Sequence, residues 1–384
     1  MRNHRRLRRI EGTVGKAFVM CMIIFFLLNL IVSDKEMSEE ENRMLAGSPR
    51  LSWSSLVSGD FMTKYETYLA DQFAGRNFWR SIKVGLSGLG GSRQEEDILI
   101  GKDDYLMEEI VSPDQDTLME NLEAIRQFAK RSRDIQTYML LVPNAANIMR
   151  DRLPAFATVS DQSRMFAQVK RELGEDVEWL DAAEALKKHA GEQIYYKTDH
   201  HWTSLGAFYT FSQVAEQMQI KTDVSSGFVS YPISTTFNGM LAAKSGCRMD
   251  VREDIYMYVP RDTDNDVVVN YVDEQRKTAS LYDSSKLKTR DQYAVFLGEN
   301  TSVVDIKTVS ESKRRLLLIK DSYANSFAPF LTPYFREIVL VDPRYYSGTI
   351  EDIMDTYRIS DVLYLYSGNT FFQDNNLKGV LSGE

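Results

Sequence analysis

The chain is poor in the residues that form covalent cross-links and metal centres. It has two cysteines and four histidines among 384 residues. Two cysteines exclude a disulfide framework, and the one conceivable bridge, between Cys21 and Cys247, would start inside an apolar run. Any zinc centre would have few ligands to draw on. Internal repeats and low-complexity tracts are also absent, and apolar residues make up 43% of the chain, which is typical of a globular protein.

The chain is acidic overall, but its charge is unevenly distributed. The net charge is −9 and the pI is about 5.2, so bulk electrostatics do not favour nucleic acid as a partner. Residues 1–16 nevertheless contain six Lys or Arg residues and one Glu, a local charge of +5. The remaining 368 residues therefore carry a charge of −14.

An apolar run follows this basic segment. Residues 17–32 include one polar residue, Asn29, and Lys16 can lengthen the span because its ammonium group reaches the interface. The positive-inside rule then predicts a cytoplasmic basic segment (1–16), a transmembrane anchor (17–33) and an extracellular remainder, that is, a single-pass protein of the cell membrane. A cleaved signal peptide is the main alternative, but the run ends without a small-x-small site. A buried core helix would not account for the arginines before it.

The rest of the chain divides into a short stalk and a folded domain. Residues 34–50 are acidic, lack apolar periodicity and predict a solvated stalk. Residues 51–384 are expected to form the domain. Near its start, residues 61–84 carry apolar and aromatic side chains at helical spacing. We interpret them as an amphipathic helix packed on the domain rather than as a partner-binding helix. Residues 97–110 predict a short hairpin.

Five apolar runs of strand length alternate with helical segments. This alternation predicts an α/β fold with a mostly parallel sheet that helices cover on both faces. Between about residues 221 and 312 the chain is polar and rich in turn residues, which predicts a β-rich insertion with strand-like pieces such as 255–259, 267–272 and 293–297. The five predicted strands of the main sheet are 137–142, 177–180, 315–319, 337–341 and 361–366.

Half of the histidines stand side by side in one motif, which reads TDHHW over residues 198–202. In an extended chain, Asp199 and His201 point to one face and His200 to the other. A carboxylate two residues before an imidazole can hold one ring nitrogen, fix the tautomer and stabilise the imidazolium, as a hydrolase requires of its Asp–His pair. Asp199 and His201 are therefore candidate catalytic residues.

A serine directly follows one of the predicted strands. The run LLLIKDSYANSF places Ser322 between an apolar strand and a helix-like segment. The carboxyl ends of parallel strands form the ligand crevice of such sheets, and a helix N-terminus directs backbone N–H groups at an oxyanion. The strand–turn–helix order resembles a nucleophile elbow without the glycines of Gly-x-Ser-x-Gly. Ser322 is therefore a candidate nucleophile.

Each motif also has an ordinary explanation. A serine after a strand is most often a helix N-cap, and adjacent histidines often occupy a polar surface turn. Asp199, His200 and His201 could also bind a metal ion, although the two rings diverge in an extended chain and no second motif supplies ligands. From the residues alone, the Ser-His-Asp triad and these alternatives all stay open. We expect neither a metal nor a cofactor.

Longer stretches around the two motifs make a family resemblance specific. The segments TDHHWTSLGAFYTF, FNGMLAAKSG, KDSYANSFAPFLTPYF and DVLYLYSGNTF resemble those of the DHHW family, and the resemblance covers about residues 35–375. DHHW proteins are similar to the SGNH hydrolase-like domain of the alginate O-acetylation proteins AlgJ and AlgX. The resemblance implies a flavodoxin-like SGNH fold in which a D-x-H motif precedes the serine segment.

The resemblance also implies roles for single residues. Asp199 would orient His201, His201 would act as general base and then as general acid, and Ser322 would be the nucleophile. The alginate proteins have Gly-Thr-Ser at the nucleophile, whereas this chain has Lys320-Asp321-Ser322. A carboxylate beside the nucleophile would oppose an oxyanion unless it points away.

Contacts to a substrate are less well defined by the resemblance. SGNH enzymes use a glycine and an asparagine as oxyanion donors, and in this chain Asn144 and Asn325 are the candidates. Two aromatic residues beside the motifs, Trp202 and Tyr323, are candidates for stacking on sugar rings. We therefore predict these four residues as the substrate-binding set.

These residues and the resemblance imply an activity. The expected protein is a membrane-anchored SGNH-like acyl-transfer protein, an O-acetyltransferase or esterase that acts on a cell-envelope polysaccharide or acylated glycan. Acetyl-CoA is cytoplasmic, so the relatives imply a multi-pass membrane partner that passes acyl groups across the membrane. The alternative from a different class is a catalytically inactive glycan-binding or assembly module with the same fold.

Overall fold

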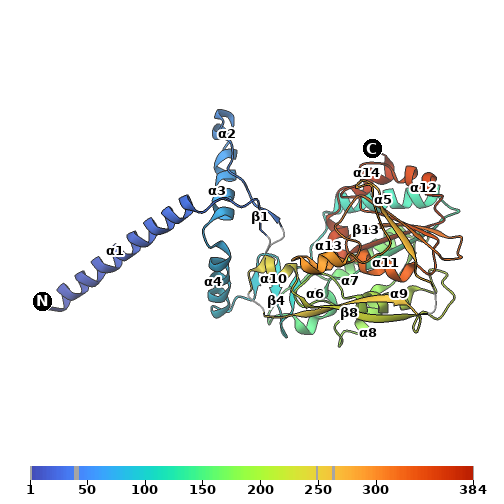
Figure 1. The fold of residues 1–384 in the computed structure, drawn as a ribbon, viewed down its shortest axis with the longest axis horizontal. Helices are drawn as coiled ribbons and strands as arrows, with labels where there is room; N and C mark the ends of the chain where they lie inside the picture. The colour runs from blue at the N-terminus through green and yellow to red at the C-terminus, as the bar shows by residue number, and fades with distance from the viewer. Residues whose placement is uncertain (1, 39–42, 248–249, 262–263, 384) are drawn as a thin grey trace. The chain divides into compact units, whose positions relative to one another are not determined.

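The computed structural model describes residues 2–38, 43–247, 250–261 and 264–383 (Figure 1). It divides the chain into two compact units, Met1–Gly91 with Gly246–Arg248, and Ser92–Ser245 with Met249–Glu384. We call them the N-terminal unit and the α/β unit and describe each by itself. The α/β unit begins at Ser92, whereas the sequence predicted a domain start at residue 51. The boundary differs because the helices between residues 53 and 89 bury a single side chain, that of Asp71.

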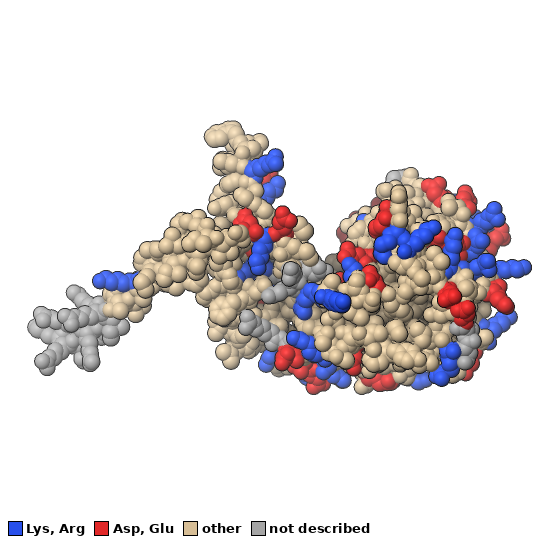
Figure 2. All heavy atoms as spheres, in the orientation of Figure 1, with Lys and Arg blue, Asp and Glu red and all other residues tan. Residues whose placement is uncertain are grey.

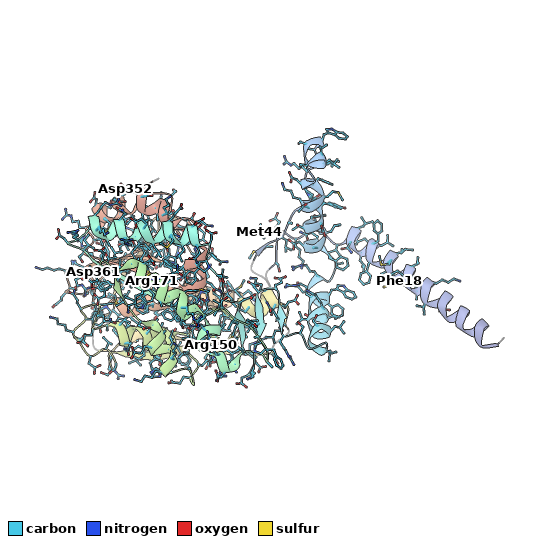
Figure 3. The ribbon with its side chains drawn as sticks, turned by 180° about the vertical axis from the view of Figure 1, so that it is seen from behind. Phe18, Met44, Arg150, Arg171, Asp352 and Asp361 are labelled. Carbon is cyan, nitrogen blue, oxygen red and sulfur yellow. The ribbon has the colours of Figure 1, made fainter. Side chains whose placement is uncertain are left out.

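The N-terminal unit opens with one long apolar helix, α1 (Arg2–Ile31). Its part from Gly12 to Ile31 has a mean hydropathy of 2.3, and none of it is buried. By length and composition this stretch is a candidate membrane span or signal sequence. Phe18, labelled in Figure 3, lies on this stretch and is 67% exposed. The side chains of residues 1–11, most of the predicted basic segment, lie outside the described residues.

Short elements follow α1 in the predicted stalk, of which residues 39–42 lie outside the described residues. Strand β1 (Met37–Ser38) pairs antiparallel with β2 (Arg43–Met44). The single helix predicted over residues 61–84 is two helices, because the chain turns at Gly75 in the left-handed region with φ of +71°. Both belong to the N-terminal unit and not to the domain on which we predicted packing. The three helices after β2 are α2 (Trp53–Val57), α3 (Asp60–Gln72) and α4 (Arg76–Leu89).

The α/β unit is built on an eight-stranded sheet with the order β11-β10-β12-β14-β13-β15-β6-β7. The five strands from β14 to β7 are parallel, and all five strands predicted from the sequence are present. Their apolar residues are buried on both faces, as parallel strands require. These strands are β6 (Gln136–Val142), β7 (Glu178–Trp179), β13 (Arg315–Lys320), β14 (Glu337–Val341) and β15 (Asp361–Ser367).

The predicted insertion divides between the main sheet and a small sheet of its own. Three of its strands extend the main sheet beyond β14, and each is antiparallel to the strand before it in the sheet, namely β12 (Val303–Thr308), β10 (Val267–Tyr271) and β11 (Arg276–Thr278). The other two, β8 (Phe228–Phe237) and β9 (Glu253–Pro260), pair with each other. The predicted strand at 293–297 is wrong, because Gln292–Val295 forms a 3₁₀-helix whose side chains are mostly buried.

The order of the parallel strands predicts where a ligand would bind. Counted from β13 as the first strand, they lie in the flavodoxin-like order 2-1-3-4-5. The chain leaves β13 toward β14 on one side and returns to β15 on the other, so the switch point lies between β13 and β15. The carboxyl ends of these two strands therefore border the crevice in which such folds bind ligands.

Helices cover both faces of the sheet, as the sequence predicted. Leu316 and Leu318 of β13 pack in one apolar cluster with Phe327 of α11 (Tyr323–Leu331). The alternate residues Leu317 and Ile319 pack in the other cluster, with α12 (Ile350–Tyr357). In Figure 1, α5 (Gln115–Arg131), α12 and α14 (Leu377–Ser382) lie on one side of the sheet, and α8 (Ala182–Lys188) and α9 (Ser204–Val214) lie on the other.

The remaining elements include the predicted hairpin at residues 97–110, which is present as β4 and β5. They are β3 (Gln94–Glu95), β4 (Ile98–Ile100), β5 (Leu106–Glu108), α5 (Gln115–Arg131), α6 (Ala145–Ile148), α7 (Gln162–Leu173), α8 (Ala182–Lys188), α9 (Ser204–Val214), α10 (Met240–Ser245), α13 (Gly368–Gln373) and α14 (Leu377–Ser382), with 3₁₀ turns at Arg150–Arg152 and Ser284–Lys288.

A buried ion pair at the start of β15 supplies a test of this fold. The Asp361 carboxylate is buried and accepts two N–H groups of Arg314 and the hydroxyl of Ser360. Asp361→Ala would leave the arginine without its partner, so we expect the free energy of unfolding to fall by roughly 2–4 kcal/mol. Asp352→Ala, at the exposed start of α12, should cost less than about 1 kcal/mol; both residues are labelled in Figure 3. Denaturant unfolding in detergent measures the free energy of unfolding of both variants. Equal losses would contradict a stabilising role of the Asp361–Arg314 ion pair.

Candidate active site

The TDHHW motif forms a tight loop rather than an extended strand. Tyr195 and Trp202 pair across it as an isolated antiparallel bridge, and residues 197–201 bend between them. The loop runs directly into α9, where the Thr203 side chain accepts the N–H of Gly206 at 3.2 Å and so caps the helix. The motif is therefore fixed at both ends.

Glu253 of β9 holds the backbone of this loop. Its buried carboxylate accepts the N–H groups of Lys197 at 2.6 Å and Thr198 at 3.0 Å, the Thr198 hydroxyl at 2.5 Å and the side-chain amide of Gln193 at 2.8 Å. Burial raises the pKa of Glu253, against the effect of these hydrogen bonds. A strand from the insertion thus clamps the residues that precede Asp199.

Ser322 lies at the carboxyl end of β13, beside the switch point of the sheet. It occupies the N-cap position of α11, yet its side chain makes no capping hydrogen bond, and its own backbone is already helical, with φ of −66° and ψ of −16°. The ordinary explanation of a serine in this position, a helix cap, therefore does not account for its hydroxyl.

One chain of hydrogen bonds joins the two motifs. Nδ1 of His201 lies 2.6 Å from Oδ1 of Asp199, and Nε2 lies 2.7 Å from Oγ of Ser322. The two segments are 121 residues apart in the sequence. Because a carboxylate can only accept, Nδ1 carries the proton, and the unprotonated Nε2 accepts the serine hydroxyl. The arrangement can remove a proton from Ser322 and return it.

Burial and neighbouring charges set the protonation of this pair. Burial alone would raise the pKa of Asp199, but the nearby His200 and His201 hold it below its ordinary value, so the carboxylate is ionised. Burial and the neighbouring His200 lower the pKa of His201 to about 4, against the attraction of Asp199. His201 is therefore a neutral base at neutral pH.

The two adjacent histidines do not diverge as an extended chain would require. Their ring centroids lie 3.9 Å apart with an interplanar angle of 36°, and Nδ1 of His200 is 3.6 Å from Oδ1 of Asp199. The prediction was wrong because the backbone bends at this point. Burial would lower the pKa of His200, but Asp199 raises it above its ordinary value, which favours a positive charge beside His201.

The carboxylate of Asp321 is turned away from the serine hydroxyl. Its two oxygens accept the backbone N–H groups of Tyr323 and Ser367, each at 2.9 Å. The N–H groups of Ala324 and Asn325 also have backbone partners. Of residues 322 to 325, Ser322 alone has an N–H group without a hydrogen bond to the described part of the chain. That group is the natural donor for the oxyanion that forms on an acyl carbonyl oxygen when Oγ of Ser322 attacks the carbonyl carbon.

With this geometry established, sequence comparison places the chain in a family. The profile described as DHHW protein matches residues 101–341, more than half of the chain. The chain belongs to the DHHW family. A search of curated proteins found no match.

Solved structures share the fold of this DHHW protein at low sequence identity. A DHHW family protein from Eubacterium siraeum is 21% identical with a TM-score of 0.61, covering 75% of this chain and 99% of that one. PatB1 of Bacillus cereus with a sulfonyl adduct is 19% identical with a TM-score of 0.60, covering 74% and 97%. The O-acetyltransferase domain of Pseudomonas putida AlgJ is 14% identical with a TM-score of 0.47, covering 75% and 99%. The predicted family is confirmed, and the α/β fold is shared with the solved DHHW family protein and with PatB1.

Two aromatic residues of the family motifs have a task that the sequence did not predict. Trp202 is 0% and Tyr323 1% exposed, so neither ring can stack on a sugar. Nε1–H of Trp202 donates to the Tyr323 carbonyl at 3.1 Å and to Oγ of Ser326 at 3.0 Å. The Tyr323 hydroxyl donates to the His200 carbonyl. These residues bind the TDHHW loop to α11 and so set the distance from His201 to Ser322.

The two predicted asparagines lie at the carboxyl edge of the sheet and are buried. Oδ1 of Asn144 accepts the side-chain amide of Gln162 at 2.8 Å and the N–H of Asn369 at 3.1 Å. Oδ1 of Asn325 accepts the buried ammonium group of Lys320 at 3.0 Å. Both amides thus hold neighbouring segments together. Their contact with a substrate stays a prediction.

Sequence reasoning missed Tyr293, which comes from the 3₁₀-helix in the insertion. Its ring stacks on the imidazole of His201 with centroids 3.7 Å apart and planes 10° from parallel. Its hydroxyl donates to Oγ of Ser326 at 3.0 Å. The two hydrogen bonds of His201 leave its imidazole free to tilt about the line that joins them. The stack on Tyr293 fixes the plane of that ring. No local pattern around residue 293 indicates this contact.

The segment FNGM, quoted above for its resemblance alone, also positions Asp199. The N–H of Met240 donates to Oδ2 of Asp199 at 2.9 Å, and the N–H of Gly239 donates to the Thr198 hydroxyl at 2.8 Å. A Cβ at Gly239 would lie 2.4 Å from Cβ and 2.5 Å from Oδ2 of Asp199. Only glycine permits this approach.

The metal alternative has a geometric basis as well. The ligand atoms of Asp199, His200 and His201 all lie within 4.8 Å of one another. A metal ion bound through either nitrogen of His201 would replace one of its two hydrogen bonds. The contact with Ser322 has no role in a metal site. Removal of metal and removal of Ser322 therefore distinguish a metal site from a Ser-His-Asp site.

The charges around His201 predict a pH dependence. His201 must be neutral to act as a base, and its pKa lies at about 4, so kcat/KM for an activated ester should stay high well below pH 6.5 and fall only at lower pH. His200→Ala removes the neighbouring charge that lowers this pKa, so the acid limb should move to higher pH. Circular dichroism at each pH excludes unfolding, and an unchanged limb in His200→Ala would refute the coupling.

The close approach at Gly239 gives a second prediction. Gly239→Ala should displace the Asp199 carboxylate and lower turnover on the order of 10²-fold, since misplacements of about 1 Å have such effects. Gly191→Ala is the matched control because a Cβ there meets nothing within 4 Å. Steady-state kinetics measure the turnover of both variants. Equal turnover would mean that Gly239 does not position the Asp199 carboxylate.

Proposed function

We propose that the protein is a membrane-anchored O-acyltransferase that uses Ser322 as its nucleophile and a cell-envelope polysaccharide as its acyl acceptor. The observation that supports this proposal is the hydrogen-bond chain Asp199–His201–Ser322 at the switch point of the sheet. Helix caps and surface turns do not require a buried, ionised carboxylate behind a neutral imidazole.

The first half-reaction transfers the acyl group to the enzyme. Nε2 of His201 takes the hydroxyl proton of Ser322 while Oγ bonds to the acyl carbonyl carbon, and the carbonyl electrons move onto oxygen. The Ser322 N–H stabilises that oxyanion, and Asp199 stabilises the imidazolium. When the intermediate collapses, the bond to the leaving group breaks and His201 returns the proton to that group.

The second half-reaction reverses these roles. A sugar hydroxyl gives its proton to His201 and attacks the acyl-serine, and Ser322 leaves with the proton that His201 returns. Water in place of the sugar would make the protein an esterase by the same steps. Both outcomes need the same three residues, so the chemistry of the site is acyl transfer in either case.

The N-terminal helix supports a membrane setting for this reaction. α1 has the length and hydropathy of a membrane span, and its basic N-terminal flank favours a cytoplasmic start with the α/β unit outside the cell. A multi-pass membrane partner would then deliver acyl groups across the bilayer.

PatB1, which shares the fold, carries a sulfonyl adduct in one structure, and sulfonyl groups are electrophiles that capture nucleophilic side chains.

Substitution of the three residues tests the proposal. Ser322→Ala and His201→Ala should each lower acyl turnover by on the order of 10⁴–10⁶-fold, and the double variant should lose no more than either, because the residues act as a unit. Ser112→Ala, an exposed serine, is the matched control and should have normal activity. A chelator should have no effect.

The results that oppose the proposal are also distinct. Loss of activity with a chelator and a mild effect of Ser322→Ala would indicate a metal site instead. If Ser322→Ala leaves glycan binding and the envelope phenotype intact while no turnover is found in the unmodified protein, the α/β unit is a glycan-binding or assembly module.

A further inference from the structure

The N-terminal unit exposes an apolar surface that the acyl-transfer site does not explain. On α4, Leu86 is 63% and Leu89 87% exposed. At 100° per residue these leucines share one face of the helix with three other apolar residues, whereas Ser87 lies on the opposite side. The stripe consists of Phe78, Trp79, Ile82, Leu86 and Leu89.

The junction between α3 and α4 lies against the end of the candidate membrane span. The Phe25 ring of α1 contacts Trp79 edge-on at a centroid distance of 5.3 Å and stacks on Phe73 at 6.1 Å. Oδ1 of Asn29 accepts the N–H of Ala74 at 2.9 Å. The polar residue in the apolar run thus pairs with the backbone of this junction.

These contacts define a depth relative to the span. At a rise of about 1.5 Å per residue, Asn29 lies about 3 Å and Phe25 about 9 Å from the end of α1 at Ile31. If α1 crosses the bilayer, the residues packed on it lie between the headgroups and the first part of the acyl chains. Interfacial amphipathic helices insert their apolar face by about 5–10 Å, which is the same depth.

The charges of α4 also suit a lipid surface. It carries Arg76, Arg80 and Lys83 and no acidic residue, and Arg76 lies 3.8 Å from Asp71 of α3. A basic amphipathic helix with aromatic residues on its apolar face is typical of segments that lie on anionic membranes. Positions 12–31 of α1 contain one charged residue, Lys16, and the visible face of this stretch in Figure 2 is tan apart from a blue group near its start.

We infer that α4 is an interfacial helix that lies in the outer leaflet beside α1, with its apolar stripe facing the acyl chains. The inference rests on the membrane anchor of the proposed function but not on its chemistry. Its consequence is that the protein has two attachments to the same leaflet. The chain that leads from α4 into the α/β unit at Ser92 then starts at the membrane surface.

Depth-dependent fluorescence quenching tests this inference on the full chain. In a background of Cys21→Ala and Cys247→Ser, one cysteine is placed at a time and labelled with an environment-sensitive dye. Leu86→Cys reports the stripe, Ser87→Cys the opposite face of α4, and Phe18→Cys the span itself. The proteins are reconstituted in vesicles of phosphatidylcholine and phosphatidylglycerol in equal amounts, with doxyl-labelled lipids or aqueous iodide as quenchers.

We expect doxyl lipids to quench the dyes at positions 18 and 86, and iodide to quench the dye at 87 several-fold more than that at 86. If doxyl lipids quench the dye at position 18 while iodide quenches the dyes at 86 and 87 equally, α4 does not lie in the membrane. That result would overturn the inference and leave the membrane anchor intact. A dye at 86 that is shielded from iodide but not quenched by lipid would overturn it in favour of a protein surface. No lipid quenching at 18 would refute the membrane anchor itself.

Discussion

In the proposed reaction His201 can act as a base only while both of its ring nitrogens keep their partners. One partner, Asp199, belongs to the same loop, and the other, Ser322, comes from a strand 121 residues later. Two hydrogen bonds of 2.6 and 2.7 Å leave little tolerance for movement of either segment. Much of the α/β unit can be understood as support for this one side chain.

The support comes from several directions. The parallel sheet fixes Ser322 at the end of β13, and α11 fixes it from the other side. Trp202 and Tyr323 hold the loop to that helix, while Glu253 holds its backbone from β9. The insertion, which is antiparallel and partly outside the parallel core, therefore contributes to the site through Glu253 and Tyr293. Such supporting groups decide whether a triad is correctly positioned or slightly too loose.

The sequence predicted the parallel strands, and it singled out Asp199, His201 and Ser322 as candidates, because these patterns are local. Uninterrupted apolar runs identify buried strands, and an Asp two residues before a His is a recognisable pair. The predicted direction of the His200 side chain was wrong because the backbone bend depends on N–H groups that donate to Glu253, which lies over 50 residues away. Tyr293 could not be found since its stack on His201 is purely tertiary. Burial of Trp202 and Tyr323 likewise depends on how α11 packs on the loop.

The proposed chemistry requires Ser322 to form a covalent acyl-enzyme, and this species can be trapped and identified. The full-length protein is mixed with p-nitrophenyl acetate, quenched in acid within the first turnover and digested for peptide mass spectrometry. We expect one acetyl group on the peptide that contains Ser322, and none on that peptide in Ser322→Ala. Release of p-nitrophenol without acetylation of Ser322, or acetylation that persists elsewhere in Ser322→Ala at the original rate, would contradict it.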